Sequence, residues 1–157
     1  MDPERVELNE LVAEVLLELQ PLVEMRQILV AVEPPLPAIW CNPTRVRQVV
    51  SNLLRNCIRH GCDPGRPRIE ISSPVRPDRP APEGRVWLRI FDNGPGISPE
   101  FQQDVFLPGR RLPGASGPGT GMGLAIVKQI VDYCGGSVAI ESDGCSGTAF
   151  WVALPSA

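Results

Sequence analysis

The chain has little lysine and histidine. Arginine supplies 14 of its 15 basic residues, Lys128 is the one lysine and His60 the one histidine. The 18 acidic residues leave a formal net charge of −3. Such a charge provides no broad attraction for nucleic acid or acidic membrane surfaces, so neither is expected as a partner. Any site for a polyanion must therefore be local.

Long apolar runs and paired cysteine motifs are also missing. No uninterrupted apolar stretch of about 18 residues occurs, which excludes a transmembrane helix. The N-terminus lacks the basic start and apolar core of a signal peptide. The five cysteines form no CxxC pair, so we interpret them as reduced thiols of a cytoplasmic protein. With 157 residues, a single domain over 1–157 is expected.

Apolar periodicity predicts three long helices, at about 9–21, 42–60 and 121–134. The first two are expected to begin at the asparagine caps Asn9 and Asn42. A short helix is expected near 98–106.

Runs of apolar or alternating residues predict the strands. They are expected at 28–32, 68–72, 85–91, 137–142 and 148–154. The proline-rich segment 73–82 cannot lie inside a sheet, because proline removes ladder donors, and it is expected to be an exposed loop. The predicted fold class is α/β, a two-layer sandwich in which a mixed sheet carries about three long helices on one face.

The second helix has an apolar face and a separate polar stripe formed by Gln48, Asn52, Asn56 and Arg59. Asparagine is a weak helix former, so two of them one turn apart need a reason. A solvated face is one reading. The other is a metal–phosphate edge, where Asn56 and Asn52 offer oxygens to Mg²⁺ and Arg59 reaches a phosphate. His60, near the helix end, is expected to stack on a base or cap the helix.

Asp92 directly follows a predicted buried strand, where a carboxylate is costly without a partner. The exocyclic amine of adenine is such a partner. Gly94 and Gly96 would let the backbone turn tightly and approach the base. Taken alone, Asp-Asn-Gly is also an ordinary turn signal.

A glycine-rich segment, Gly119-Thr120-Gly121-Met122-Gly123-Leu124, precedes the third helix. Unpaired amides at a helix N-terminus bind phosphate readily. The segment lacks the Gly-Lys-Ser/Thr of a P-loop and does not follow a first strand as a dinucleotide fingerprint would. The signatures of a protein-kinase glycine loop are also missing.

Taken together in their order, these segments resemble the catalytic domain of sensor histidine kinases. Residues 44–56 resemble the N box, 92–97 the G1 box and 119–126 the G2 box, while 144–148 is similar to the final Gly-Thr turn. The resemblance covers nearly the whole chain. It implies a Bergerat-type α/β sandwich that binds Mg-ATP under a mobile lid at about 108–119.

The resemblance also implies roles for individual residues. Asn56 would coordinate magnesium with Asn52 near it, and Asn52 and Arg59 are the expected catalytic residues. Arg110 and Arg111 are further candidate charge partners in the lid. The residues expected to bind the nucleotide are Asn56, His60, Asp92, Gly94, Gly96, Gly119, Thr120, Gly121, Met122, Gly123, Leu124 and Thr148.

The expected function is transfer of the γ-phosphoryl group of ATP to a histidine on a separate dimerisation domain, in two-component signalling with a response regulator. The chain contains no phosphoacceptor histidine, since His60 lies in the wrong element. A glutamate base stands at the position of Asn52 in the hydrolytic relatives, and an amide cannot take a proton from water. A serine-kinase anti-sigma factor and a non-catalytic nucleotide-sensing or docking module remain as alternatives. The segment 56–61 resembles the former.

Overall fold

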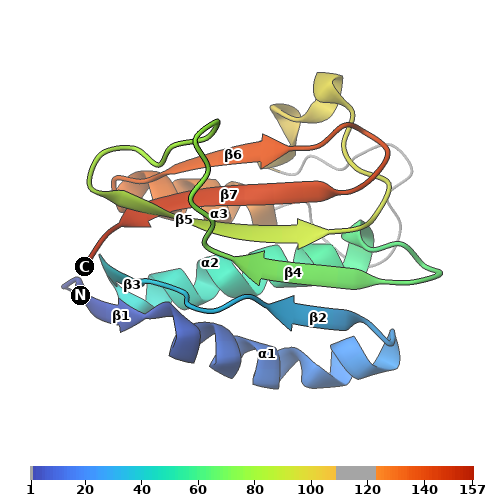
Figure 1. Cartoon of the computed structure of the whole chain (residues 1–157), viewed down its shortest axis with the longest axis horizontal. Helices are drawn as coiled ribbons and strands as arrows, with labels where there is room; N and C mark the ends of the chain where they lie inside the picture. Colours follow the sequence, from blue (N-terminus) through green and yellow to red (C-terminus); the bar gives the residue numbers. More distant parts are fainter. Residues whose placement is uncertain (1, 109–122) are drawn as a thin grey trace.

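A five-stranded mixed sheet carries three helices on one face (Figure 1). This arrangement is seen in a computed structural model that describes residues 2–108 and 123–157. The strand order is β2-β4-β5-β7-β6; β2 and β4 are parallel and the other neighbours are antiparallel. The strands are β2 (Leu29–Val32), β4 (Arg68–Ser72), β5 (Arg85–Asp92), β6 (Ser137–Glu141) and β7 (Thr148–Pro155).

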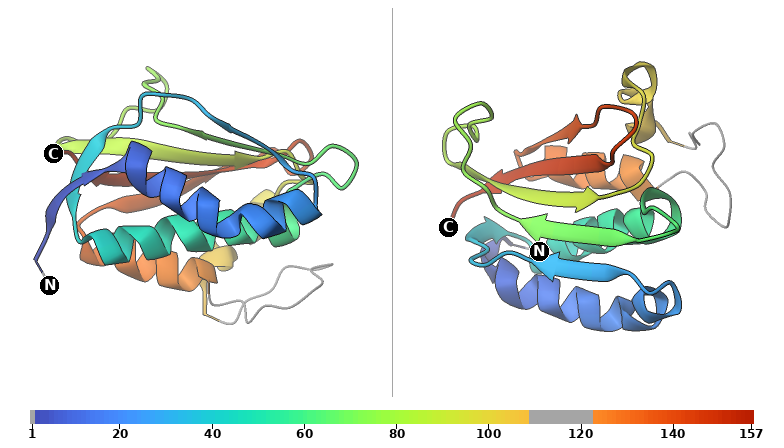
Figure 2. Two further views of the ribbon diagram at one scale, coloured as in Figure 1. Left: turned by 90° about the horizontal axis from the view of Figure 1, so that it is seen from below. Right: turned by 45° about the vertical axis from the view of Figure 1, so that its right-hand side comes forward.

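The three helices form a single layer beneath the sheet (Figure 2). They are α1 (Leu8–Met25), α2 (Pro43–Asn56) and α3 (Gly123–Tyr133). The main core lies between the two layers, where apolar side chains of all three helices meet those of β4, β5 and β7. This is the predicted two-layer sandwich, and the α/β prediction is confirmed.

A two-stranded antiparallel ribbon at the edge of the fold was not predicted. It pairs β1 (Glu4–Glu7) with β3 (Ala38–Cys41). A bridge between Ile39 and Ser156 joins the ribbon to the chain end that follows β7. Each strand has only four residues, which is too short for a clear period-2 pattern.

Both predicted ends of the first helix were wrong. The strand β1 runs directly into α1, so Glu7 is the N-cap, and Asn9 instead accepts a hydrogen bond from the Leu36 backbone N–H over 3.0 Å. The helix also continues through Pro21 to Met25. The carbonyl that Pro21 leaves without its helix partner belongs to Leu17, a residue that is 70% exposed. Core packing further along α1 favours continuation.

The second helix begins as predicted. The Asn42 side chain accepts from the Arg45 backbone N–H over 3.2 Å, and Pro43 occupies the first turn. Its α-helical part ends at Asn56, however, and a π-helical turn, η1 (Cys57–Gly61), follows. Single π turns occur frequently at functional sites. The 100° spacing that predicted the polar stripe therefore ends before Arg59.

The short helix predicted near 98–106 has the predicted location but is not α-helical. Two 3₁₀ turns, η2 (Pro99–Phe101) and η3 (Asp104–Phe106), replace the single short helix expected near 98–106.

The predicted loop between β4 and β5 crosses the face of the sheet that lies opposite the helices (Figure 1). Trp151, on β7, is fully buried there, and its ring meets that of Trp87 edge-on with centroids 5.5 Å apart. The Trp87 indole N–H donates to the Arg79 carbonyl oxygen over 3.0 Å, which anchors the loop to β5. The segment 73–82 thus contains no helix or strand, as predicted, but it packs against the sheet and is only partly exposed.

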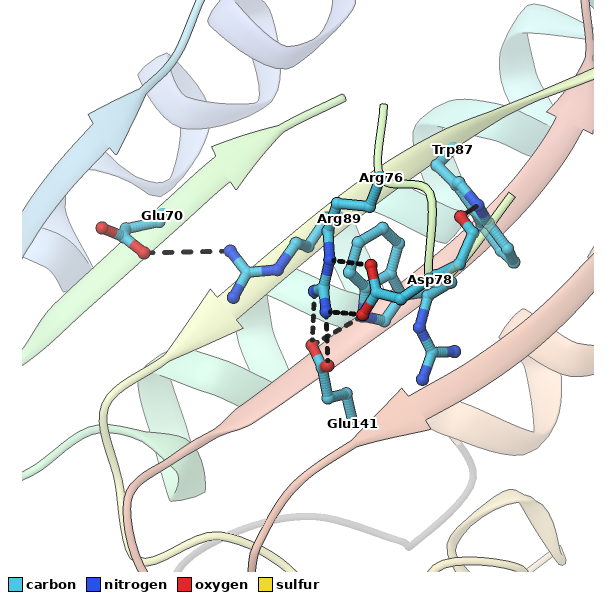
Figure 3. Close-up of polar contacts among 8 residues, drawn as sticks. Glu70, Arg76, Asp78, Trp87, Arg89 and Glu141 are labelled. Carbon is cyan, nitrogen blue, oxygen red and sulfur yellow. Dashed lines mark hydrogen bonds and ion pairs between the residues drawn. The ribbon is translucent and has the colours of Figure 1, made fainter. Parts of the chain in front are cut away.

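Two arginines of the loop, Arg76 and Arg79, pack over the ring of Trp151. The guanidinium carbons of Arg76 and Arg79 lie 5.4 and 5.2 Å from the centre of the Trp151 ring, within the range of cation–π attraction. Arg76 also pairs with Asp78 and with Glu141 at the edge strand (Figure 3). The proline-rich loop is thus fixed to the outer face of the sheet by stacking and charge together.

Candidate functional site

Asp92 is the last residue of β5, and its side chain is 2% exposed. Side chains alternate between the two faces of a strand. Leu88 and Ile90 belong to the core between the sheet and the helices, so Asp92 lies on the same face of β5, toward the helices. Thr148, its neighbour in register on β7, is also buried. A carboxylate and a hydroxyl thus lie together between the sheet and the helix layer.

The Asp92 carboxylate has a specific set of donors. It accepts from the Gly94 backbone N–H over 3.1 Å, from the backbone of Thr148 and from the Cys57 thiol of the π turn. Burial nevertheless raises the pKa of Asp92 to about 6, although these three donors oppose the shift. The same burial, with the Asp92 charge next to it, raises the pKa of the Cys57 thiol well above its usual range. Asp92 is therefore a carboxylate held close to its titration point near neutral pH.

Gly147 makes a close approach that only glycine permits. Its φ is +123°, and a Cβ there would lie 2.3 Å from the backbone oxygen of Asp92. Gly96 is similarly constrained, because its φ is +80° and a Cβ would lie 2.7 Å from Ser142 Oγ. The loop after β5 and the turn between β6 and β7 are thus in direct contact.

The Ser142 hydroxyl joins these two turns. It donates to the Gly147 carbonyl oxygen over 2.6 Å and accepts from the Ile97 backbone N–H over 3.0 Å. The sequence analysis included Gly147 in the final Gly-Thr turn at 144–148 but gave a role only to Thr148, and it did not single out Ser142.

Asn93 ties the loop after β5 to the segment that follows η1. Its side-chain oxygen accepts from the backbone N–H groups of Asp63 and Arg68, and its nitrogen donates to the Arg66 carbonyl. These three bonds hold the backbone on one side of Asp92.

The two asparagines of the predicted metal edge lie at the C-terminal end of α2. The Asn52 side-chain nitrogen donates over 3.4 Å to the carbonyl oxygen of Gly123, the first residue of α3. Asn56 lies one turn later and directly precedes Cys57, which contacts Asp92. The end of α2 therefore links the start of α3 to the buried carboxylate.

Arg59 and His60 lie on the π turn, and both are exposed. The backbone oxygen of Arg59 accepts from the Arg26 guanidinium over 3.2 Å, as does that of Ile58 over 2.7 Å. Arg26, beyond the end of α1, thus fastens the π turn. The predicted roles of Arg59 and His60 stay predictions.

Several predicted residues lie outside the described ranges. These are Gly119, Thr120, Gly121, Met122, Arg110 and Arg111, with all but the first residue of the predicted lid. Leu124, inside the ranges, packs against the core. Among the predicted residues, the structure thus brings Asp92 together with Gly94 and Thr148, and Asn52 together with Gly123. Asn56 lies on α2 next to Cys57, which is an unexpected contact of Asp92.

The donor set at the end of α2 suits magnesium. Asn52 uses its nitrogen toward Gly123, so its amide oxygen remains as an acceptor. Asn56 offers a second amide oxygen one turn away. Mg²⁺ prefers oxygen ligands and keeps waters and phosphates in its remaining positions. These residues therefore fit such an ion.

The fold and this site define a nucleotide-binding domain of the histidine kinase type, and comparisons with known proteins agree. The family model for histidine kinase-, DNA gyrase B- and HSP90-like ATPases matches residues 41–157. The chain belongs to this family.

The individual relatives within this family are sensory histidine kinases. The chain is 33% identical to the adaptive-response sensory kinase SasA of Prochlorococcus marinus, over 98% of its own length but 41% of that of SasA. It spans about two fifths of the length of the curated relatives it matches.

Among solved structures, a mycobacterial sensor histidine kinase, MprB, is 30% identical, with a TM-score of 0.77 and 98% of each chain covered. Full-length ShkA, crystallised with AMPPNP, is 25% identical with a TM-score of 0.80; the match covers 100% of this chain and 32% of ShkA. The resemblance to sensor histidine kinases is thereby confirmed. No helix in the described ranges is long and apolar enough to cross a membrane.

Proposed function

We propose that this chain is the catalytic and ATP-binding domain of a sensor histidine kinase. It binds Mg-ATP and transfers the γ-phosphoryl group to a histidine on a separate dimerisation domain, which in turn serves a response regulator. The observation that carries this proposal is the buried Asp92, linked through Cys57 and α2 to the start of α3. One end of the helix layer thus offers both a base-binding carboxylate and a phosphate-binding helix start.

Asp92 recognises the base. Its ionised carboxylate accepts a hydrogen bond from the exocyclic amine of adenine, whereas guanine presents a carbonyl oxygen at the same position. Two acceptors facing one another repel, so the site discriminates against guanine. Gly94 and Thr148 hold the carboxylate in place through their backbone amides. The AMPPNP bound to the relative ShkA supports an adenine nucleotide as ligand.

The triphosphate extends toward the start of α3. Gly123 is the first residue of α3, and the backbone N–H groups at the N-terminus of a helix bind phosphate readily. Asn56 and Asn52 hold Mg²⁺ through their amide oxygens. When bound, the ion neutralises charge on the transferring phosphoryl group. Arg59 adds a positive charge from the π turn.

Asn52 disfavours ATP hydrolysis because its amide cannot act as a general base. An amide has no basic site for a proton from water, so water at the γ-phosphate is not activated. The site therefore positions the phosphoryl group for an external acceptor and hydrolyses ATP slowly. Catalysis rests on positioning and electrostatics.

The test is a phosphotransfer assay. The chain is mixed with γ-labelled ATP, Mg²⁺ and a histidine-bearing dimerisation domain from a related kinase. Acid-labile, base-stable label on that domain is expected, and the acceptor with its histidine replaced by glutamine is the control.

Acid-stable phosphoserine on a protein substrate would instead favour the anti-sigma alternative. Rapid ATP hydrolysis by the chain alone would contradict the role given to Asn52. Failure to bind Mg-ATP in calorimetry would leave only the docking module.

A further inference from the structure

Two thiols that are far apart in the sequence meet at the end of the helix layer. Cys41 is the last residue of β3 and is 3% exposed, and Cys134 directly follows α3 and is half-buried. The Cys41 thiol donates to Cys134 Sγ over 3.0 Å. A disulfide bond is about 2.05 Å long, so the sulfurs need to close by roughly 1 Å to form one.

The two thiols differ in accessibility. Burial and, after it, the adjacent Cys134 raise the pKa of Cys41 to about 12, although the Asn42 backbone N–H acts in the opposite direction. Cys41 is thus a buried, protonated thiol that reacts slowly with solutes. Cys134 reaches the surface next to Tyr133, which is 88% exposed. An oxidant in solution therefore meets Cys134 first.

The other three cysteines have different neighbours. The Cys57 thiol is fully buried against Asp92, and Cys62 Sγ lies 3.7 Å from the Arg68 carbonyl oxygen. Cys145 is exposed next to Asp143. None of these contacts places a second sulfur within hydrogen-bonding distance.

We propose that Cys41 and Cys134 form a reversible disulfide when a peroxide oxidises the chain. The Cys134 thiol first releases its proton, and the thiolate attacks one oxygen of hydrogen peroxide. The O–O bond breaks, a sulfenic acid forms, and the leaving hydroxide takes up the released proton to give one water. The Cys41 sulfur then attacks the sulfenic sulfur, the S–O bond breaks, and a second water leaves with the Cys41 proton. Two thiols and one peroxide thus give one disulfide and two waters. The sulfurs lose two electrons, which the peroxide accepts, and a dithiol reverses the reaction by exchange.

The disulfide would fasten the helix layer at a defined place. Cys41 immediately precedes the N-cap of α2, and Cys134 immediately follows α3. The two helices run antiparallel, since the Asn52 bond to Gly123 joins their other ends. The thiol pair and the candidate nucleotide site therefore lie at opposite ends of one helix pair. Disulfides in reducing compartments are usually transient and redox-sensing, which suits an accessible thiol with a buried partner.

Peptide mapping tests this proposal directly. The reduced chain is treated with a small molar excess of hydrogen peroxide, its remaining thiols are alkylated, and the protein is digested without reductant. We expect a cross-linked peptide that contains Cys41 and Cys134, a mass lower by two hydrogens, two fewer alkylated thiols than before oxidation, and full reversal by dithiothreitol.

Matched variants define the pair. Cys134→Ser is expected to abolish the cross-link, while Cys145→Ser, at an exposed thiol, keeps it. Five alkylated cysteines after oxidation, sulfinic acid at Cys134 without a cross-link, or a persistent disulfide in Cys134→Ser would each overturn the proposal. If a variant fails to fold, the peptide map of the unaltered chain still decides.

Discussion

The side-chain nitrogen of Asn52 donates to the carbonyl oxygen of Gly123 over 3.4 Å. This bond joins the last turns of α2 to the first turn of α3, where a helix N-terminus presents unpaired amides. The bond leaves the amide oxygen of Asn52 available next to Asn56. Asn52 thus also holds the start of α3, in addition to the magnesium-binding role that we propose for it together with Asn56.

Replacing Asn56 should remove the magnesium dependence of nucleotide binding. In the unaltered chain, chelation of Mg²⁺ with EDTA is expected to weaken ATP binding by roughly tenfold or more, since charge-assisted ligands contribute about 1.5–3 kcal/mol. In Asn56→Ala, affinity should be low with or without the ion. Calorimetry measures both. Gln48→Ala, two turns earlier on the same helix, is the matched control, and equal magnesium dependence in Asn56→Ala would contradict this assignment.

Nucleotide affinity should depend on pH through Asp92. The ionised carboxylate accepts more strongly from the adenine amine than the protonated acid does, and burial raises the pKa of Asp92 to about 6. The dissociation constant is therefore expected to rise, by up to about tenfold per pH unit, as pH falls below 6. Titrations between pH 5 and 8 measure this. Asp92→Asn should bind about 10- to 100-fold more weakly at pH 8, and the ratio between the two proteins should shrink at low pH. A constant ratio would exclude Asp92 as the titrating contact.

The same carboxylate should make stability depend on pH. The folded-state pKa of Asp92, about 6, lies above its ordinary value of 3.8. The folded chain thus binds this proton more tightly than the unfolded chain does. The resulting contribution to the unfolding free energy is complete below pH 3.8 and is lost as pH rises through 6. Above that pH the ionised group costs up to about 3 kcal/mol.

Asp92→Asn should remove this contribution. We expect the unfolding free energy of the variant, relative to the unaltered chain, to be higher at pH 8 than at pH 4. Urea denaturation at the two pH values measures the difference. Asp132→Asn, at an exposed carboxylate on α3 that pairs with Lys128, serves as the control. A difference of the opposite sign would mean that the donors around Asp92 outweigh its burial.

Gly147→Ala should destabilise the fold through a steric clash. A methyl group there would lie 2.3 Å from the Asp92 backbone oxygen, on a backbone with φ of +123°. We expect a loss of about 2–4 kcal/mol in unfolding free energy. Gly84→Ala is the matched control, since φ is +72° and nothing lies within 4 Å of its added Cβ. Similar losses in the two variants would show that backbone strain alone, without the clash, is responsible.

Much of the fold could be predicted from local patterns. The strand before Asp92 and the asparagine cap of α2 were found because alternation and capping are local signals. The ribbon of β1 and β3 was missed because four-residue edge strands carry little pattern. The passage of α1 through Pro21 was missed because distant core packing outweighs the local cost of proline.

Part of the candidate site depended on tertiary contacts. The sequence analysis gave Cys57 no role beyond that of a reduced thiol, yet its thiol bonds to Asp92 from a π turn that helical periodicity does not reveal. The Ser142 hydroxyl accepts from the backbone N–H of Ile97, which lies 45 residues earlier in the chain, and so bridges two turns. No local motif encodes such a bridge, so only the folded arrangement identifies it.

The loop packed over Trp151 also determines what the tryptophan fluorescence of this protein can measure. Trp87 and Trp151 lie on the sheet face away from Asp92, shielded by Arg76 and Arg79, and Trp40 lies on the edge ribbon. Intrinsic indole emission should therefore follow the melting of the sandwich and respond little to a bound nucleotide. Val75, 99% exposed at the crest of that loop, is the natural place for a dye or an affinity tag that leaves the opposite layer undisturbed.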